Sequence, residues 1–269
     1  MKKWPLVTLL SDFGLRDSYV AEMKAVILGI CQRAIIVDIS HEVEKYNVRM
    51  GAYILARAAP FFPEGTVHVA VVDPSVGTQR RSIIVTTKRS MYVGPDNGLL
   101  MLSAQKEKIS HIYSITNSKF MQKNVSNTFH GRDIFSPVAA YLIKGIPASR
   151  FGPEIMDPCM PIFFQPTIFE QEIHGEAIYI DCFGNIITNI TKKHLDTADI
   201  KIGDNLSVTL KEKIIDAKMC STYGEVSVKT PIVIIGSSGF LELAINQGDA
   251  SKILDVKAGD KLSLKIRQK

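Results

Sequence analysis

The sequence predicts an α/β protein with two domains. These are an N-terminal α/β domain with a mostly parallel central sheet at residues 1–163 and a C-terminal all-β barrel domain at residues 172–269. In the first half, apolar strands alternate with amphipathic helices, which is the βαβ pattern of a parallel sheet. Short β-branched runs separated by Gly turns follow, and these are typical of a small barrel. The Pro-rich stretch PCMPIFFQPT (158–167) between the two regions reads as a linker.

Two helices in the first half carry recognisable end signals. Apolar residues recur at helical spacing from Val20 to Ile30, and an Asp-Ser pair at 17–18 suits the start of that helix. Asn47 is a suitable N-cap for the second helix, and Pro60 would stop it. Apolar strands lie before, between and after the two helices. In order, the predicted elements are a strand at 4–10, a helix at 17–30, a strand at 34–40, a helix at 47–59 and a strand at 65–73.

Further elements complete the two predicted domains. RSIIVTT (81–87) and SMYVG (90–94) read as short strands. GRDIFSPVAAYLIKG (131–145) reads as a helix that begins just before Pro137, because the first turn of a helix tolerates proline. The predicted barrel strands lie within 175–190, 205–211, 225–246 and 260–268.

The composition is that of an ordinary globular protein. The chain has 269 residues, of which 46% are hydrophobic and 22% charged, and its net charge of +5 is spread without the basic stripe of a nucleic-acid binder. No apolar run approaches the roughly 20 residues of a membrane span. Asp12 interrupts the opening apolar run, which favours a strand over a signal peptide. The scattered cysteines, without metal-ligand spacing, indicate reduced thiols and a cytoplasmic location; they are Cys31, Cys159, Cys182 and Cys220.

Acidic residues follow successive predicted strands. Asp12 and Asp17 come after the first strand, DISHEVEKY (38–46) follows the second, and Asp73 ends the third. A loop of Pro, Ser, Gly and Thr then leads from Asp73 to Arg80. Ligands of open parallel sheets bind beyond the carboxyl ends of the strands, so these residues are expected to share one rim. Asp17 is equally explained as a helix cap, and an Asp-Arg pair can be purely structural.

The stretch SNTFHGRDIF (126–135) is the second concentration of functional residue types. His130 stands in a Gly-containing loop before a predicted helix, where backbone N–H groups are free. Asp12, Asp17, Asp73, His130 and Asp133 form the candidate set for an oxygen-rich metal site, but no H-E-x-x-H, paired-His or D-x-D spacing supports it. The glycine patterns of phosphate-binding and dinucleotide-binding loops are also missing.

Seven stretches of the chain, in order, carry a resemblance to a known family. They are SDFGLRDSYVAEMK (11–24), IVDISHEV (36–43), FFPEGTVHVAVVDPSVGTQRR (61–81), GPDNGLL (94–100), TFHGRDIFSPVAA (128–140), IYIDCFGNIITNI (178–190) and GSSGFLELAINQG (236–248). Together they resemble the S-adenosyl-L-methionine (SAM) hydroxide adenosyltransferases, adenosine-forming SAM hydrolases related to the fluorinase and chlorinase. The resemblance covers nearly the whole chain.

The resemblance implies an enzyme that hydrolyses SAM to adenosine and methionine. SAM would be the substrate, with no cofactor, no metal, and no nucleic-acid or membrane partner. The family's architecture is an N-terminal α/β domain and a C-terminal barrel, assembled as a homotrimer. SAM would bind where the N-terminal domain of one subunit meets the C-terminal domain of its neighbour.

The resemblance also assigns roles to individual residues. The water-activating trio falls on Asp73, Arg80 and His130. The implied substrate-binding residues are Asp12 at the ribose, Asp17 at the methionine end, Tyr46 packed on the substrate, Asp181, Phe183 and Asn185 at methionine and adenine, Ser237 at the methionine carboxylate, and backbone groups near Ile245 and Gln247 at the adenine edge.

Some positions depart from the family pattern, and other functions remain open. Ser75 stands where the family usually has Gly, and Ser238 stands where the fluorinase has an arginine. A SAM halogenase is one alternative, although the fluorinase has tyrosine and threonine at the positions of Asp73 and Val76, and Tyr-Ser at 130–131. A non-catalytic SAM- or adenosine-binding protein is another, and a metal-dependent nucleotide hydrolase is a third.

Overall fold

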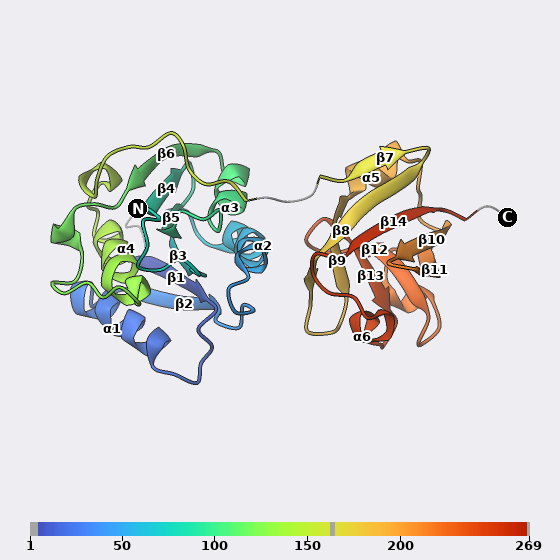
Figure 1. Ribbon diagram of the computed structural model, residues 1–269, viewed down its shortest axis with the longest axis horizontal. Helices are drawn as coiled ribbons and strands as arrows, with labels where there is room; N and C mark the ends of the chain where they lie inside the picture. The colour runs from blue at the N-terminus through green and yellow to red at the C-terminus, as the bar shows by residue number, and fades with distance from the viewer. Residues whose placement is uncertain (1–4, 162–164, 268–269) are drawn as a thin grey trace. The chain divides into compact units, whose positions relative to one another are not determined.

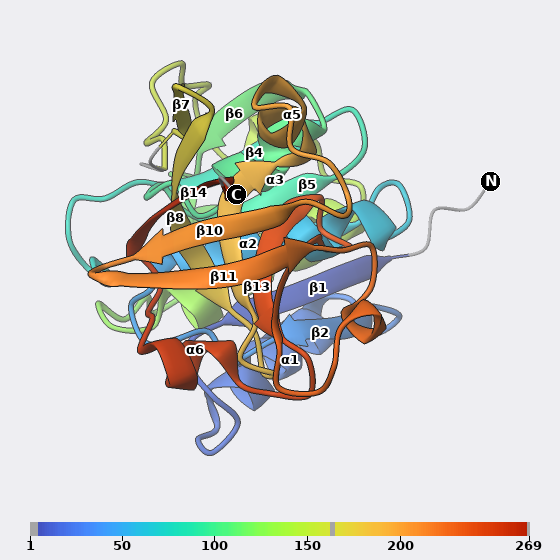
Figure 2. The same ribbon diagram turned by 90° about the vertical axis from the view of Figure 1, so that its right-hand side faces the viewer.

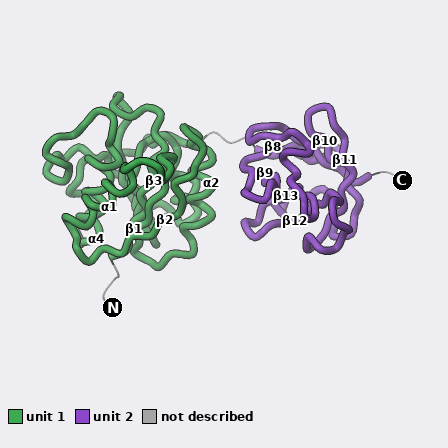
Figure 3. The backbone as a smooth tube through the Cα atoms, turned by 90° about the horizontal axis from the view of Figure 1, so that it is seen from below, with its two compact units in different colours: residues 1–162 green, residues 163–269 purple. Residues whose placement is uncertain are grey.

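The computed structural model describes residues 5–161 and 165–267. The chain forms two compact units, Met1–Ile162 and Phe163–Lys269 (Figure 3). The first is an α/β unit and the second a β-barrel, so the predicted fold class is confirmed at this level. Residues 162–164 of the predicted linker lie outside the described residues. Among the helices of the described part, none has the length and apolar character needed to cross a membrane.

The sheet of the first unit is mixed. β2, β1, β3 and β5 pair in parallel in that order, whereas β4 pairs antiparallel with both β5 and β6. The turn between β4 and β5 is too short for a crossover, so these two strands form a hairpin. The finer expectation of a mostly parallel sheet is therefore not confirmed. The strands are β1 (Leu6–Ser11), β2 (Ile35–Ser40), β3 (Val67–Val71), β4 (Ser82–Thr87), β5 (Met91–Pro95) and β6 (Ile109–Ser114).

Helices cover both faces of this sheet. α1 (Tyr19–Ile30) packs with α4 (Ser136–Ile143) on one face, and α2 (Val48–Ala58) packs with α3 (Met101–Lys106) on the other (Figure 1). The predicted ends of α2 are confirmed, since Met50 N donates to Asn47 Oδ1 at 3.0 Å and the helix ends at Ala58. Short 3₁₀ turns occupy Ala59–Phe61, Ser118–Phe120 and Ala148–Arg150.

The strand register brings three carboxyl ends to one edge of the sheet. Ser11 pairs with Val71 across β1 and β3, and Leu10 pairs with Ser40 across β1 and β2. The loops that follow these strands therefore begin side by side. A π-helix at Gly131–Phe135 leads directly into α4. Pro137 lies in the first turn of α4, as expected.

The second unit is a barrel closed by the pairing of β14 with β8. Its wall runs β14-β10-β11-β12-β13-β9-β8, and β7 extends the sheet beyond β8. Two short helices, α5 (Lys192–Thr197) and α6 (Ala250–Leu254), lie at opposite ends of the barrel (Figure 2), and a 3₁₀ turn spans Tyr223–Glu225. The strands are β7 (Thr167–Phe169), β8 (Glu172–Ile180), β9 (Ile186–Thr191), β10 (Asn205–Leu210), β11 (Lys213–Met219), β12 (Pro231–Ile235), β13 (Phe240–Ile245) and β14 (Lys261–Ile266).

Candidate active site

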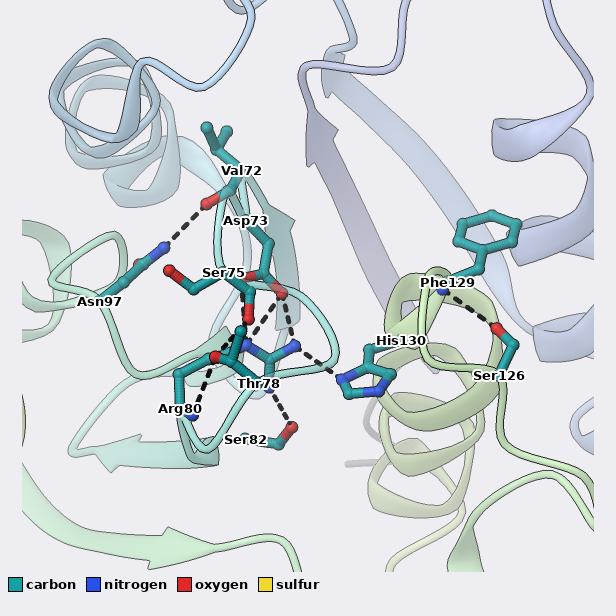
Figure 4. A network of polar contacts seen from close by, with 10 residues as sticks. All are labelled: Val72, Asp73, Ser75, Thr78, Arg80, Ser82, Asn97, Ser126, Phe129 and His130. Carbon is teal, nitrogen blue, oxygen red and sulfur yellow. Dashed lines mark hydrogen bonds and ion pairs between the residues drawn. The ribbon is translucent and has the colours of Figure 1, made fainter.

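An arginine hub joins the loop after β3 to the loop before α4 (Figure 4). Arg80 Nε donates to both Asp73 oxygens, at 3.0 and 2.9 Å, and Nη2 donates to Asp73 Oδ2 at 2.5 Å. The same Nη2 donates to His130 Nδ1 at 2.7 Å, while Nη1 donates to Ser82 Oγ at 2.8 Å. The Arg80 and Asp73 side chains are only 8% and 4% exposed, so this is a buried ion pair with most of its hydrogen-bonding capacity satisfied.

The hub fixes the protonation state of His130. A guanidinium can only donate, so Nδ1 of His130 accepts, and the proton of the neutral ring lies on Nε2. Burial and the positive charge of Arg80 lower the pKa of His130 below its usual value, against a smaller opposing effect of Asp73. At neutral pH, His130 is therefore a neutral imidazole that offers an Nε2–H donor.

The loop between Asp73 and Arg80 is held by its own backbone and by the His130 loop. Thr78 N and Oγ1 both donate to Ser75 O, at 3.2 and 2.8 Å. Gly77 has φ +76, and a Cβ there would lie 2.1 Å from Asn127 O, so only glycine allows the two loops to approach this closely. Ser75 itself is exposed, so a side chain at this position meets no crowding from the two loops.

Asp12 is held at the neighbouring strand end. Its side chain accepts a hydrogen bond from Tyr46 N at 2.9 Å, and its carbonyl accepts one from Lys45 Nζ at 2.6 Å. Tyr46 has φ 65, the left-handed region that residues other than glycine seldom adopt, and this conformation directs its N–H to the carboxylate. Asp12 is 6% exposed, whereas Tyr46 is 70% exposed.

These strand ends open onto one cleft with a volume of about 450 Å³. The structure brings four of the predicted site residues to its wall: Asp12, Tyr46, Asp73 and His130. Arg80 is not among the described residues that line the cleft and lies behind Asp73 and His130. The other lining residues are Phe13, Tyr19, Glu22, Lys45, Val71, Val76, Ser126, Thr128, Phe129, Gly131 and Arg132.

Sequence reasoning missed a charged wall of this cleft. Arg132 donates to Glu22 at 2.8 Å and to Asp133 Oδ1 at 2.7 Å, so these bonds join α1 to the π-helix before α4. Hydrogen bonds from Ser18 and Arg132 lower the pKa of Glu22. Burial of Asp133 opposes its ionisation, but Arg132 and the backbone of Ser126 hold its pKa below the usual value. The adjacent Arg132 and Asp133 were visible in the sequence as a possible ion pair. Nothing in the sequence indicated that Glu22 of α1 would join them.

Three aromatic rings form an apolar wall that was also not predicted. Phe13 and Tyr19 lie 5.6 Å apart, Phe13 and Phe129 5.6 Å, and Tyr19 and Phe129 5.1 Å between ring centroids. Such tilted and edge-on packing is favourable, and it gives the cleft an apolar face. Each ring is next to a residue that the sequence analysis singled out, but nothing in their spacing indicated a cluster.

Asp17 is not brought to this cleft. It is exposed, and it lies outside the described residues that line the cavity. The N-cap position of α1 is occupied by Ser18, whose hydroxyl donates to Glu22 rather than capping the helix. Among the described residues, no group of three His, Cys, Asp or Glu side chains is arranged to hold a metal ion.

In the barrel, three predicted residues share one turn between β8 and β9. Asp181 Oδ1 accepts from Phe183 N and Asn185 N, both at 2.9 Å, and Oδ2 accepts from Asn185 Nδ2 at 2.9 Å. Gly184 has φ +83 and packs against Asp249, which ties this turn to the start of α6. The turn leaves Phe183 74% exposed.

The remaining predicted residues lie at the ends of β12 and β13. Ser237 is an exposed residue of the Gly236–Gly239 turn, and the hydroxyl of neighbouring Ser238 is buried without a hydrogen-bond partner. Ile245 is the last residue of β13, and its carbonyl accepts from Gly248 N at 2.9 Å. Gln247 is exposed, with φ 51, and its carbonyl accepts from Lys229 Nζ at 2.8 Å.

Comparison with known proteins gives a consistent result over both units. Residues 7–152 match the model of the SAM hydroxide adenosyltransferase N-terminal domain, and residues 175–263 match the model of the C-terminal domain. The chain is 39% identical to the (R)-S-adenosyl-L-methionine hydrolase of Methanocaldococcus jannaschii, covering 96% of this chain and 95% of that protein. It is 36% identical to the protein of the same name from Thermus thermophilus, over 94% and 96%.

More distant and structural relatives extend this picture. The fluorinase of Actinopolyspora mzabensis is 29% identical over 95% of each chain. A crystal structure of an uncharacterized conserved protein from Thermotoga maritima superposes with a TM-score of 0.92 at 39% identity, over 96% of this chain and 99% of that one.

Proposed function

The chain belongs to the SAM hydroxide adenosyltransferase family, and we propose that it hydrolyses SAM to adenosine and L-methionine. The observation that carries the proposal is the Arg80 hub, which holds a carboxylate and a neutral imidazole side by side on the wall of one cleft. These groups are suited to positioning and deprotonating a water molecule, which is the chemical requirement of this reaction.

The reaction needs an activated nucleophile more than it needs an acid. The water oxygen forms a bond to C5′ of SAM while the C5′–S bond breaks, and the electrons of that bond neutralise the sulfonium. Methionine leaves as a neutral thioether and needs no proton, whereas the attacking water must lose one. The balance is therefore SAM and water giving adenosine, methionine and a proton. Alignment of water, C5′ and sulfur supplies a large part of the acceleration.

Asp73 and His130 are the proposed contacts of the water. The carboxylate of Asp73 accepts one of its protons, and the Nε2–H of His130 donates to its oxygen and stabilises developing hydroxide character. His130 does not serve as the base in this arrangement, because its other nitrogen already accepts from Arg80. Arg80 orients both groups and pairs the buried charge of Asp73.

The nucleoside and methionine ends are assigned to the remaining predicted residues. Asp12 accepts from the ribose hydroxyls, Tyr46 packs on the substrate and Asp17 meets the methionine end. In the barrel, the proposed contacts of methionine and adenine are Asp181, Phe183, Asn185, Ser237, Ile245 and Gln247. The exposed ring of Phe183 and the strained left-handed backbone of Tyr46 support these assignments, since both are features of surfaces that receive a ligand.

The proposed assembly is a homotrimer in which SAM lies between the N-terminal domain of one subunit and the barrel of the next. The proposed domain limits are residues 1–163 and 172–269.

We also propose that the reaction is metal-independent and takes place in the cytoplasm. The four cysteines are all free thiols, as in a reducing compartment; they are Cys31, Cys159, Cys182 and Cys220.

One product analysis tests the activity. Purified protein is incubated with SAM and excess EDTA, with and without chloride, and the products are separated by chromatography. Adenosine and methionine in equal amounts, unaffected by EDTA or chloride, are expected. Chlorodeoxyadenosine formed only with chloride would instead assign a halogenase. Loss of turnover with EDTA would contradict the metal-independent reaction, and SAM recovered intact would indicate a binding protein without turnover.

A further inference from the structure

A buried Ser–His pair joins the ends of β1 and β2. Ser11 is the last residue of β1, and His41 follows β2 directly. Ser11 Oγ and His41 Nδ1 are 2.7 Å apart, and the two residues are 0% and 3% exposed. Neither belongs to the described residues that line the cleft, so Ser11 has no access to a substrate and is not a nucleophile. The pair therefore acts on something other than the reacting atoms.

The pair is part of a directed chain of polar contacts. Phe13 N donates to Ser11 Oγ at 3.3 Å, so the serine oxygen accepts from the turn that follows β1. The serine proton is then available to His41 Nδ1. When Nδ1 accepts from the serine, the ring carries a proton on Nε2, and Nε2 lies 3.2 Å from Asp38 Oδ1. Asp38 is in turn paired with Lys24 of α1 at 2.6 Å.

The turn at the end of this chain carries Asp12. Asp12 lies between Ser11, which bonds to the histidine ring, and Phe13, which donates to Ser11. The backbone of the same histidine holds the far side of the turn, because Gly14 N donates to His41 O at 2.7 Å. His41 thus contacts the turn on both sides of Asp12, through its ring and through its carbonyl.

We propose that Ser11 and His41 are positioning residues that set the place of the Asp12 carboxylate, and through it the affinity for the ribose of SAM. This rests on the proposed function of Asp12. Removing the serine hydroxyl leaves Nδ1 of a buried histidine and the Phe13 N–H without their partner, and the turn between them loses its internal restraint. The hub of Asp73, Arg80 and His130 has its own contacts and is not altered.

The same strand offers a matched control. Thr8, three residues earlier in β1, bonds through Oγ1 to Nδ1 of His68 at 2.8 Å. Thr8 and His68 are both 0% exposed and are register partners across β1 and β3. This pair lies in the middle of the sheet, away from the strand ends. Thr8→Val and Ser11→Ala therefore remove the same kind of buried hydroxyl, and only Ser11→Ala acts next to Asp12.

The test compares Ser11→Ala and Thr8→Val with the wild-type protein in two measurements. For Ser11→Ala we expect the Kd of SAM to rise about tenfold with kcat changed less than about twofold, and the amides of residues 12–14 to exchange hydrogen faster. Thr8→Val should lower the melting temperature without changing the Kd, and Ser11→Thr, which retains a hydroxyl, should restore binding. An equal rise of Kd in both variants, or none in Ser11→Ala, would overturn the proposal.

The two proposals fail separately. Absence of turnover or SAM binding in the wild-type protein contradicts the proposed function. Hydrogen exchange needs no ligand and still decides the positioning role. Exchange in residues 12–14 that is no faster in Ser11→Ala than in Thr8→Val would overturn it even if the wild-type protein is fully active.

Discussion

The two units hold their predicted site residues in place in opposite ways. In the α/β unit, Asp73 and His130 lie far apart in the sequence and are brought together by Arg80, with the charged groups buried. In the barrel, Asp181 and Asn185 lie in one turn, and two hydrogen bonds to the Asp181 carboxylate join them directly. Phe183 in that turn remains 74% exposed.

This difference separates a reacting group from a recognition surface. A buried, paired carboxylate beside a neutral imidazole is organised before the substrate arrives, which is what electrostatic catalysis requires. An exposed aromatic ring on a tight turn has no other ring within that turn to pack on. It contributes to binding by packing on a ligand. Substitutions in the hub of Asp73, Arg80 and His130 should therefore act on turnover, and substitutions in the barrel turn should act on binding.

The largest effect is expected for Arg80→Lys. Lysine keeps the charge but lacks the planar fork whose separate nitrogens reach Asp73, His130 and Ser82, so the carboxylate and the imidazole lose their common orientation. Turnover should fall about 10²- to 10⁴-fold while the Kd of SAM changes little. Steady-state kinetics and calorimetric titration with SAM measure the two quantities.

The neighbouring arginine is the matched control for this variant. Arg81 also pairs with carboxylates, donating to Asp96 and Asp157, but its contacts lie outside the cleft. Arg81→Lys should retain nearly full turnover. Equal losses in the two variants would mean that the Arg80 hub is a structural ion pair, and the distinction between the two units would fail.

A smaller effect, on binding, is expected for Asp12→Asn. The asparagine oxygen can still accept from Tyr46 N, so the turn is kept, but the negative charge that accepts from ribose hydroxyls is lost. The Kd of SAM should rise about 10- to 100-fold. Adenosine binding should weaken by the same factor, since the ribose is common to both molecules. Unchanged adenosine binding would remove Asp12 from the ribose site.

Sequence reasoning reached the parts of the site that are local in the chain. Asp12 and Asp73 stand at strand ends, so topology predicted that they share one rim, and both line the cleft. Arg80 lies seven residues after Asp73 on the same loop and contacts it from outside the described lining. Strand ends carried the information for Asp12 and Asp73. Asp181, Phe183 and Asn185 were instead assigned from the family resemblance, and the structure shows that they form one turn whose contacts are local in the chain.

The parts it did not reach depend on contacts between distant segments. The Glu22–Arg132 pair spans 110 residues, and Ser11 and His41 meet only because β1 and β2 are neighbours in register. Asp17 illustrates the reverse case, since it follows the same strand as Asp12 yet is exposed outside the cleft. The antiparallel placement of β4 also depends on a hairpin whose partner strand was not specified by its apolar pattern.

In the barrel, Phe183→Ala should weaken SAM binding by about 3- to 10-fold through lost ring packing. The ring is exposed, so the melting temperature should not change. Phe169→Ala in β7 removes the ring of a residue that is 67% exposed on the same barrel, and it should leave the Kd unchanged. Similar weakening in both variants would mean that a general loss of apolar surface, and not a specific site, explains the effect.

The smallest expected effect is on pH dependence, and it should belong to the α/β unit. Burial and Arg80 place the pKa of His130 below its ordinary value of 6.5, so the ring stays neutral until the medium is more acidic than that. Protonation puts a hydrogen on Nδ1, which then can no longer accept from Arg80, and the hub opens. Turnover should therefore be flat at and above pH 7 and decline only below pH 6.5.

The contribution of His130 to stability follows the same sign. Its pKa is lower in the folded state, so the unfolded chain binds the proton first, and this contribution is lost as pH falls from 6.5 through the folded pKa.

His130→Gln should lower turnover but remove the titration from the acid limb of the pH–rate profile. His111→Gln is the control, because His111 is exposed, pairs with Glu154 and does not line the cleft. If both variants keep the acid limb of the wild-type protein, a group other than His130 controls it, and protonation of the Asp73 carboxylate, the proposed base, is the next candidate.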